Sequence, residues 1–389
     1  MKLVVQLKLL PTLEQASALE ATLHAVNAAA NHVSTVAFKR EVFSRNDLQK
    51  ITYGEVRAGF GLSAQPTVRV VKKVVDAYTT LRTNIGAGRL GPEGSPRRAK
   101  AEGKPIHFRP DAAQPFDDRC LSWQTDARTV SIWTTMGRLK GVAFTGSPTQ
   151  LKTLAEHRQG ESDLVYRDGM WFLVATCEVP EAPLNTDPAD WVGVDRGIVN
   201  LATTSDGDNH QGRRLARYRR WHARKRAELQ AKKTQGSRSA ARCLTKRAHR
   251  ETRHATHTNH KISKEIVSVA ERTGRGIALE DLSGIRDRVR HRGDQRATLS
   301  TWPFHQLEQH IRYKAQRAGV PVQAVDPAYT SQTCPRCGHV AKQNRSTRDD
   351  FCCRRCGLAG PADVVAAVNV TRRARTAWVF VNTPAPQRT

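Results

Sequence analysis

Three acidic residues stand at positions where a divalent metal site could form. Asp195 and Glu280 each end a short apolar run, and Asp363 opens an Ala-rich stretch just after a proline. We expect the first two at strand ends and the third in the first turn of a helix, where side chains converge. Several carboxylates at one point can hold the divalent ions used in phosphodiester hydrolysis. We therefore predict that they are magnesium ligands at a catalytic centre, although each alone is equally compatible with a capping or pairing role.

Four cysteines near the C-terminus have the spacing of a zinc site. The pattern Cys-x2-Cys-x15-Cys-x2-Cys is formed by Cys334, Cys337, Cys353 and Cys356. Two such knuckles present four thiolates tetrahedrally to zinc, and a site with four protein ligands is structural because no coordination position stays open. Free or oxidised thiols are the alternative. Cys352 would lengthen the second knuckle by one residue, so we interpret it as a bystander.

The charge of the chain predicts a polyanionic partner. Among 389 residues, 63 Lys and Arg face 36 Asp and Glu, a formal net charge of +27. Between residues 213 and 253 there are 16 basic and two acidic residues, a net charge of +14. Lys and Arg contacts to phosphates supply most sequence-independent nucleic-acid binding, so we predict a nucleic-acid surface there. The alternative is a solvated helical face.

Other features of the sequence point to an intracellular protein. We find no signal-peptide core and no run of about 18 apolar residues, so we expect a cytoplasmic protein with no membrane partner. The single cysteines Cys120, Cys177 and Cys243 do not suggest a disulfide framework, and we expect them to be small buried apolar residues.

Hydrophobic patterning predicts a β-rich first part with a helical insertion. Residues 1–10 alternate like a strand, and Thr12 with Gln15 has the form of a capping box that begins a helix. Short β-like runs follow between about 106 and 179. Residues 181–188 are typical of a linker, after which a buried strand leads to Asp195 and a basic helical region begins after a turn at residues 206–207.

The acidic residues also carry a family resemblance. Gly193-Val-Asp195-x-Gly197, Leu279-Glu-Asp-Leu282 and Asp363-x-x-Ala-Ala367-x-Asn369 resemble, in this order, the three split motifs of TnpB and related type V CRISPR effectors. The family's third motif usually has Asn where this chain has Val365. Residues 329–333 resemble the lead-in to the family's zinc ribbon. Leu9 to Gln15 and the pair Asn27 and Asn31 resemble its N-terminus more loosely.

The resemblance implies an α/β multidomain fold. Residues 1–190 would form a wedge-type β-barrel, with a helical recognition insert over about 12–95. Residues 191–378 would form an RNase H-like, RuvC-like nuclease domain with a zinc ribbon inserted at 330–360, and we expect a disordered tail over 379–389. Asp195, Glu280 and Asp363 would bind magnesium, and Asp281 would be a structural neighbour.

The activity implied is that of a transposon-associated, RNA-guided DNA endonuclease. It would bind a guide RNA and cut double-stranded DNA beside a short adjacent motif, with the RNA supplying sequence and the protein supplying shape and charge. Three alternatives stay open at this point. They are a guided DNA-binding protein with an impaired nuclease, a small type V CRISPR effector, and a transposase or resolvase that acts on DNA without a guide.

Overall fold

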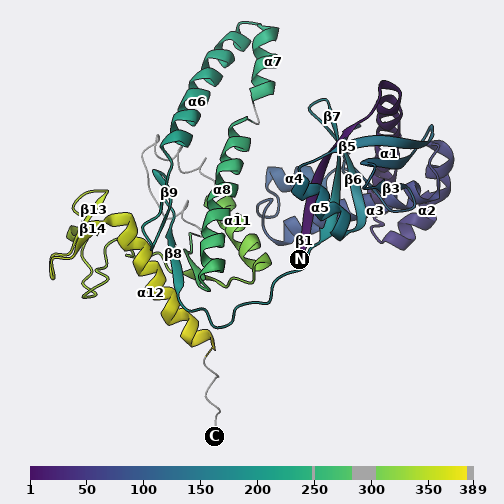
Figure 1. Ribbon diagram of the computed structural model, residues 1–389. Coiled ribbons are helices and arrows are strands. Elements are labelled where there is room, and N and C mark those ends of the chain that lie inside the picture. The colour runs from purple at the N-terminus through teal and green to yellow at the C-terminus, as the bar shows by residue number, and fades with distance from the viewer. Residues whose placement is uncertain (248–249, 283–303, 383–389) are drawn as a thin grey trace. The chain divides into compact units, whose positions relative to one another are not determined.

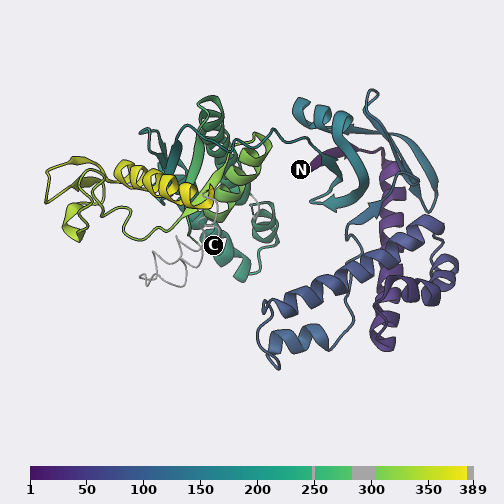
Figure 2. The ribbon, with the colours of Figure 1, turned by 90° about the horizontal axis from the view of Figure 1, so that it is seen from below.

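A computed structural model describes residues 1–247, 250–282 and 304–382 of the chain (Figures 1 and 2). The chain divides into two compact units, Met1–Val179 and Pro180–Thr389. Each unit has its own sheet and its own apolar core. Both are mixtures of helices and strands, as the α/β prediction requires.

The first unit is built on a seven-stranded sheet that curls towards closure. Every neighbouring pair of strands in it is antiparallel. The predicted first strand is confirmed, and its alternation directs Val5, Leu7 and Leu9 into the core. In spatial order the strands are β2 (Gln114–Phe116), β6 (Arg158–Arg167), β7 (Met170–Glu178), β1 (Lys2–Leu10), β5 (Gly137–Thr145), β4 (Thr129–Thr134) and β3 (Leu121–Gln124).

A block of helices interrupts this sheet between its first and second strands. It contains α1 (Leu13–Arg40), α2 (Arg45–Gly59), α3 (Ala64–Gly86) and α4 (Pro96–Glu102), while α5 (Pro148–His157) lies between β5 and β6. The capping box at the start of α1 is confirmed. Thr12 Oγ1 accepts from the Gln15 backbone at 3.2 Å, and Gln15 Oε1 accepts from the Thr12 backbone at 3.1 Å. These two bonds between residues three positions apart explain where the helical block begins.

Two asparagines of α1 join the helical block to the strands. Asn27 is fully buried and donates to the carbonyls of Pro110 and Ala112 at 2.9 and 2.8 Å. Asn31 donates to the Phe108 carbonyl at 3.0 Å and accepts from the Phe108 backbone at 2.7 Å. The pair therefore satisfies the irregular backbone that leads into β2, which is a structural role.

The second unit is built on a mixed five-stranded sheet. Its order is β10 (Asn209–Gln211), β9 (Asn200–Thr204), β8 (Trp191–Asp195), β11 (Gly276–Glu280) and β12 (Val322–Val325). The pairs on either side of β9 are antiparallel, whereas β8, β11 and β12 are parallel. Parallel strands are usually buried on both faces, and all five residues of β11 are buried.

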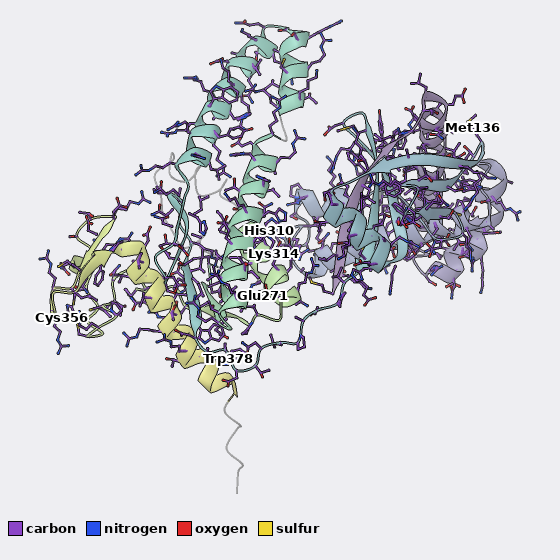
Figure 3. All side chains as sticks on the ribbon, in the orientation of Figure 1. Met136, Glu271, His310, Lys314, Cys356 and Trp378 are labelled. Carbon is purple, nitrogen blue, oxygen red and sulfur yellow. The ribbon has the colours of Figure 1, made fainter. Side chains whose placement is uncertain are left out.

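Helices cover both faces of this sheet. On one face lie α8 (Arg250–Arg272) and α11 (Phe304–Arg317), which pack against Val192 and Val194. On the other face lies α12 (Ala362–Asn382), whose Trp378 makes an edge contact with Trp191 at a ring-centroid distance of 5.2 Å (Figure 3). Strand alternation therefore turns Trp191, Gly193 and Asp195 towards α12.

Two further parts extend from this core. A basic hairpin of α6 (Arg213–Thr234) and α7 (Arg238–Arg247) follows β10, and a ribbon with η1 (Lys342–Asn344), β13 (Asp350–Cys352) and β14 (Ala359–Pro361) precedes α12. Cys120 and Cys177 are buried as predicted. The prediction for Cys243 is wrong, because it lies on an exposed side of α7. Helix α12 continues to Asn382, four residues into the stretch predicted to be disordered, and residues 383–389 lie outside the described residues.

The crossing of α12 over β8 depends on Gly193. A Cβ atom there would lie 2.0 Å from the Ala367 carbonyl oxygen and 2.5 Å from Thr371 Oγ1. The Gly193 backbone N–H also donates to Thr371 Oγ1 at 2.8 Å. Helix and strand backbones thus approach too closely for any side chain at this position.

We predict that Gly193→Ala destabilises the second unit by about 1–3 kcal/mol or more, because α12 must shift away from the sheet. Thermal unfolding followed by circular dichroism measures the change. Gly54→Ala is the matched control, since a Cβ at Gly54 meets nothing within 4 Å and alanine favours its helix. Equal unfolding midpoints for the two variants would contradict the close approach.

Candidate active site and metal-binding cluster

The three predicted acids come together at one end of the five-stranded sheet. Asp195 is the last residue of β8 and Glu280 the last of β11, and these parallel strands are neighbours. Asp363 lies in the first turn of α12, which packs against β8. Residues separated by more than 80 positions are therefore neighbours because parallel strands end at the same edge and α12 begins there.

Burial and repulsion define the electrostatics of this acidic centre. Glu280 is only 6% exposed and shares a hydrogen bond with Asp195. Burial, then repulsion from Glu280 and Asp363, raises the pKa of Asp195 to about 8. Burial also raises the pKa of Glu280. The protein alone thus favours protons on carboxyl groups that divalent cations would stabilise in the ionised form.

Neutral and basic side chains hold the carboxylates in place. Thr330 Oγ1 donates to Glu280 Oε1 at 2.7 Å. Asn200 Nδ2 donates to Asp363 Oδ2 at 2.9 Å, and Arg345 Nη2 donates to its Oδ1 at 3.3 Å. Each oxygen of Asp363 therefore accepts one hydrogen bond and keeps a second lone pair with which it could coordinate a divalent ion.

Sequence reasoning missed four of the residues that surround the acidic centre. They are Arg196, Asn200, Thr330 and Arg345. Arg196 carried a signal as a charged residue directly after a strand-end acid, and Thr330 lies in the segment 329–333 that resembles the family's lead-in to the ribbon. Asp281, predicted to be a structural neighbour, has an exposed side chain and continues the ladder through a backbone bond to the Val325 carbonyl at 2.7 Å.

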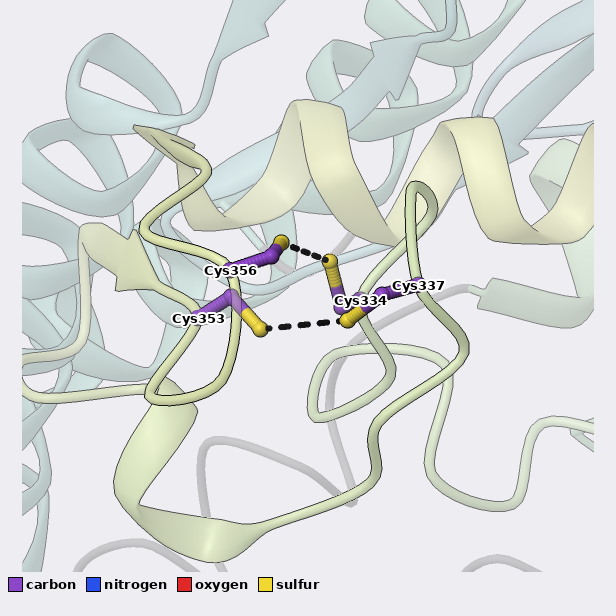
Figure 4. Close-up of side chains that lie close together, drawn as sticks. All are labelled: Cys334, Cys337, Cys353 and Cys356. Atoms are coloured by element: carbon purple, nitrogen blue, oxygen red, sulfur yellow. Dashed lines mark hydrogen bonds between the residues drawn. The ribbon is translucent and has the colours of Figure 1, made fainter.

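The four predicted cysteines form a compact cluster that could hold a metal ion. The sulfurs of Cys334, Cys337, Cys353 and Cys356 all lie within 4.8 Å of one another (Figure 4). Within residues 1–247, 250–282 and 304–382, no other group of three or more such ligands converges as tightly. By this measure the acidic centre is more open, which agrees with the engaged oxygens of Asp363.

The spacing and the pKa values of the four thiols favour a bound cation. Although burial acts in the opposite direction, backbone N–H groups of Cys356 and Arg355 lower the pKa of Cys353 to about 6. The pKa of Cys356 is raised, because burial and hydrogen bonds to the other three thiols outweigh the backbone hydrogen bond from Leu358. Sγ atoms pair at 3.5 Å between Cys334 and Cys356 and at 3.6 Å between Cys337 and Cys353. Four negative sulfurs at this spacing would repel one another strongly, so the donor set suits a divalent metal.

Asn369 and Val365 of α12 connect this cluster to the acidic centre. Asn369 Nδ2 donates to the carbonyls of Thr330 and Thr333 at 2.8 and 2.7 Å, just before the first cysteine. Val365 is buried in the small apolar cluster around the cysteines. The residue that departs from the family pattern therefore packs within the apolar core of the ribbon.

The basic hairpin of α6 and α7 keeps most of its charge unneutralised. The two acids of residues 213–253 are paired internally, Glu251 with Arg219 and Arg226, and Glu228 with Arg224 and Lys225. Figure 3 shows the side chains of both helices projecting outward. Such a surface suits a run of phosphates.

Comparisons with known proteins agree with this geometry. Residues 175–283 match the family model OrfB_IS605, described as a probable transposase, and residues 304–370 match the TNB domain of Cas12f1-like proteins. The resemblance to the TnpB family is thereby confirmed. The two matched segments contain Asp195, Glu280, Asp363 and the four cysteines.

Curated relatives extend the match. The chain is 43% identical over 114 residues to a CRISPR-associated endodeoxyribonuclease Cas12f1 of Sulfoacidibacillus thermotolerans, covering 29% of this chain and 26% of the relative. It is 32% identical over 168 residues to a TnpB-like protein of Methanocaldococcus jannaschii (43% and 60% covered). It is 28% identical over 226 residues to the putative RNA-guided DNA endonuclease InsQ of Escherichia coli (52% and 53% covered). The matches thus span between about a quarter and three fifths of these relatives.

A solved structure supports the fold. The chain superposes with a TM-score of 0.53 and 11% identity on CasPhi-2 (Cas12j) bound to crRNA, over 96% of this chain and 98% of that chain. At this level of identity the likeness is one of fold. None of the described helices is long and apolar enough to cross a membrane.

The raised pKa of Asp195 predicts a pH-dependent stability. Between pH of about 4 and 8 the native state keeps a proton that the unfolded chain releases, so the free energy of unfolding falls as the pH rises through this window. Asp195→Asn removes the titration. We expect the unfolding midpoint of this variant to rise relative to that of the wild type as the pH increases from 4 to 8. Thermal scans without added divalent ions measure the difference. Asp187→Asn, an exposed change in the same unit, should give a constant difference, and the same result for Asp195→Asn would contradict the prediction.

Proposed function

We propose that this chain is a metal-dependent, RNA-guided DNA endonuclease that cuts at the acidic centre of Asp195, Glu280 and Asp363. The observation that carries the proposal is the meeting of these carboxylates from three separate elements at one edge of a sheet, where their mutual repulsion favours bound cations. The named relatives are endonucleases of this kind, which supports the same activity here.

The fold class supports a finer interpretation of both units. A mixed sheet with helices on each face and acids at one strand edge is compatible with the RNase H-like, RuvC-like nuclease domain of residues 191–378. The ribbon over 330–360 is its insertion. The curled antiparallel sheet with its helical block is the wedge-type barrel and recognition insert of residues 1–190.

In the reaction, the chain's own residues position the metal ligands. Magnesium ions, when bound by the three carboxylates, would polarise the phosphate and activate water. Thr330 orients Glu280, and Asn200 holds one oxygen of Asp363. The Arg345 guanidinium lies 3.3 Å from the other oxygen and brings positive charge to the place where a phosphate would enter.

The partners follow from charge. The net charge of +14 over residues 213–253 suits a guide RNA paired with a DNA strand, because phosphates are contacted without regard to sequence. Guide pairing then selects the double-stranded DNA target. Solved Cas12 neighbours are complexes with guide RNA, which is compatible with this assignment.

The cysteine cluster is proposed to be a structural zinc site. Four thiolates leave no open position for a substrate, and among the described residues no histidine, aspartate or glutamate joins the cluster. Zinc bound there would fix the ribbon, which in turn supplies Thr330 and Arg345 to the acidic centre.

We predict that Asp195→Ala reduces DNA cleavage to background while the protein still carries its RNA, because the substitution removes a metal ligand and leaves every basic residue of the hairpin in place. The assay combines the purified protein and its copurified RNA with magnesium and matched DNA, and the RNA is sequenced first. Asp208→Ala is the control and should cut normally. Cleavage by the Asp195→Ala variant would show that the proposed centre is not the one that acts.

The same preparation separates the other candidates. A type V CRISPR effector is favoured by the 43% identity to Cas12f1, and it would carry RNA transcribed from a repeat array in place of RNA from transposon ends. An enzyme acting on DNA alone would carry no defined RNA. A guided protein with an impaired nuclease would bind matched DNA and leave it uncut.

For the ribbon, we predict that Cys334→Ser lowers bound zinc from about one ion per chain to near zero and destabilises the second unit. Elemental analysis of the purified protein measures this. Cys352→Ser is the matched control because Cys352 lies beside the cluster and is not part of it. Unchanged zinc in Cys334→Ser would rule out the assignment.

A further inference from the structure

The sheet does not by itself fix the two central carboxylates against each other. The ladder between β8 and β11 runs from Trp191 and Gly276 to Val194 and Leu279, and stops there. The next residues, Asp195 and Glu280, pair outward instead, with Thr203 of β9 and Val325 of β12. Their relative position therefore depends on a contact outside the ladder.

Besides the side-chain hydrogen bond between the two acids, Arg196 makes such a contact to the main chain. Its Nη2 donates to the backbone carbonyl of Glu280, so the residue after one acid is bonded to the main chain of the other. The Arg196 side chain is 0% exposed. Because it follows Asp195 in the chain, it lies on the opposite face of the sheet from α12, against α11.

A glutamate of α11 holds the guanidinium in this orientation. Arg196 Nη1 donates to Glu308 Oε2 at 2.9 Å, and Glu308 Oε1 accepts from Arg312 Nε, also at 2.9 Å. Glu308 is 20% exposed. The planar fork of arginine thus reaches the Glu280 carbonyl and an acid on a covering helix at the same time, which a point charge cannot do.

The charge of Arg196 is not its main contribution, because it favours the ionised carboxylates and also repels the cations that they would bind. A buried guanidinium costs several kcal/mol to desolvate, and a positive charge beside a site for divalent cations opposes their binding. What the residue contributes is geometry. It fixes the distance between the ends of β8 and β11 beyond the last pair of the ladder between them.

We propose that Arg196 is a positioning residue for the metal-binding carboxylates, holding the main chain of Glu280 in register with Asp195. This inference rests on the proposed function of the acidic centre. It assigns to a residue of the first motif a role that neither the motif nor the spacing of the acids indicates.

The test is manganese binding, followed by electron paramagnetic resonance on the zinc-loaded full-length protein. Mn²⁺ serves as the probe, and Asp195→Ala defines the part of the signal that belongs to the acidic centre. In Arg196→Met we expect the dissociation constant of Mn²⁺ at the acidic centre to rise about 10- to 100-fold, as is typical when a residue that supports a metal ligand is lost. Loss of the positive charge alone would change it in the opposite direction, so the sign of the shift separates geometry from charge.

Two further variants sharpen the result. Arg196→Lys keeps the charge and lacks the forked pair of donor nitrogens that spans the Glu280 carbonyl and Glu308. Weaker Mn²⁺ binding in this milder variant therefore again reports geometry, even if Arg196→Met does not fold. Arg275→Met removes a two-bond pair with Asp206, at 2.8 and 2.6 Å, elsewhere in the same unit and should bind Mn²⁺ normally.

The outcomes are distinct. Weaker binding in both Arg196 variants, with Arg275→Met unchanged, supports the proposal. Unchanged or tighter binding in Arg196→Met or Arg196→Lys overturns it and leaves the proposed function intact. Equal losses in Arg275→Met overturn it as well, because any lost ion pair would then suffice. If the wild type shows no Mn²⁺ binding that depends on Asp195, the proposed function fails together with the inference.

Discussion

Three carboxylates in a poorly solvated site repel one another, and several residues of the second unit offset part of this repulsion. Arg196, Arg345 and Arg373 each act against the repulsion, yet the pKa of Asp195 stays well above its ordinary value. The centre therefore keeps a deficit of positive charge. A site for divalent cations requires carboxylates that are held close together with too little positive charge around them until the cations bind.

The ribbon is part of the acidic centre and not only an appendage. Its lead-in supplies Thr330 to Glu280, and the segment between its cysteine pairs supplies Arg345 to Asp363. Asn369 ties the lead-in to α12, and Val365 packs among the cysteines. The ribbon therefore helps to position two of the three carboxylates, Glu280 and Asp363, through direct contacts.

Charge is separated within the second unit. Asp195, Glu280 and Asp363 meet at the sheet edge, whereas the hairpin of α6 and α7 is almost wholly basic, and its one acid, Glu228, is paired with Lys225. Opposite requirements explain this division, since divalent ions need converging carboxylates and a long polyanion needs an extended positive surface. A single mixed surface would serve neither ligand well.

The sequence by itself determined the features that depend on covalent spacing and local periodicity. The capping box of α1, the strands that end at Asp195 and Glu280, the helix that begins at Asp363 and the paired cysteines all follow from neighbours a few positions apart. Only the tertiary structure decided which distant side chains meet. Arg196 and the Glu280 carbonyl are 84 positions apart, and Asn200 and Asp363 are 163 apart. Exposure at Cys243 and burial at Val365 were decided in the same way. A periodic pattern says which face of an element is apolar, but strand register, ladder ends and the crossing of α12 over β8 determine what that face touches.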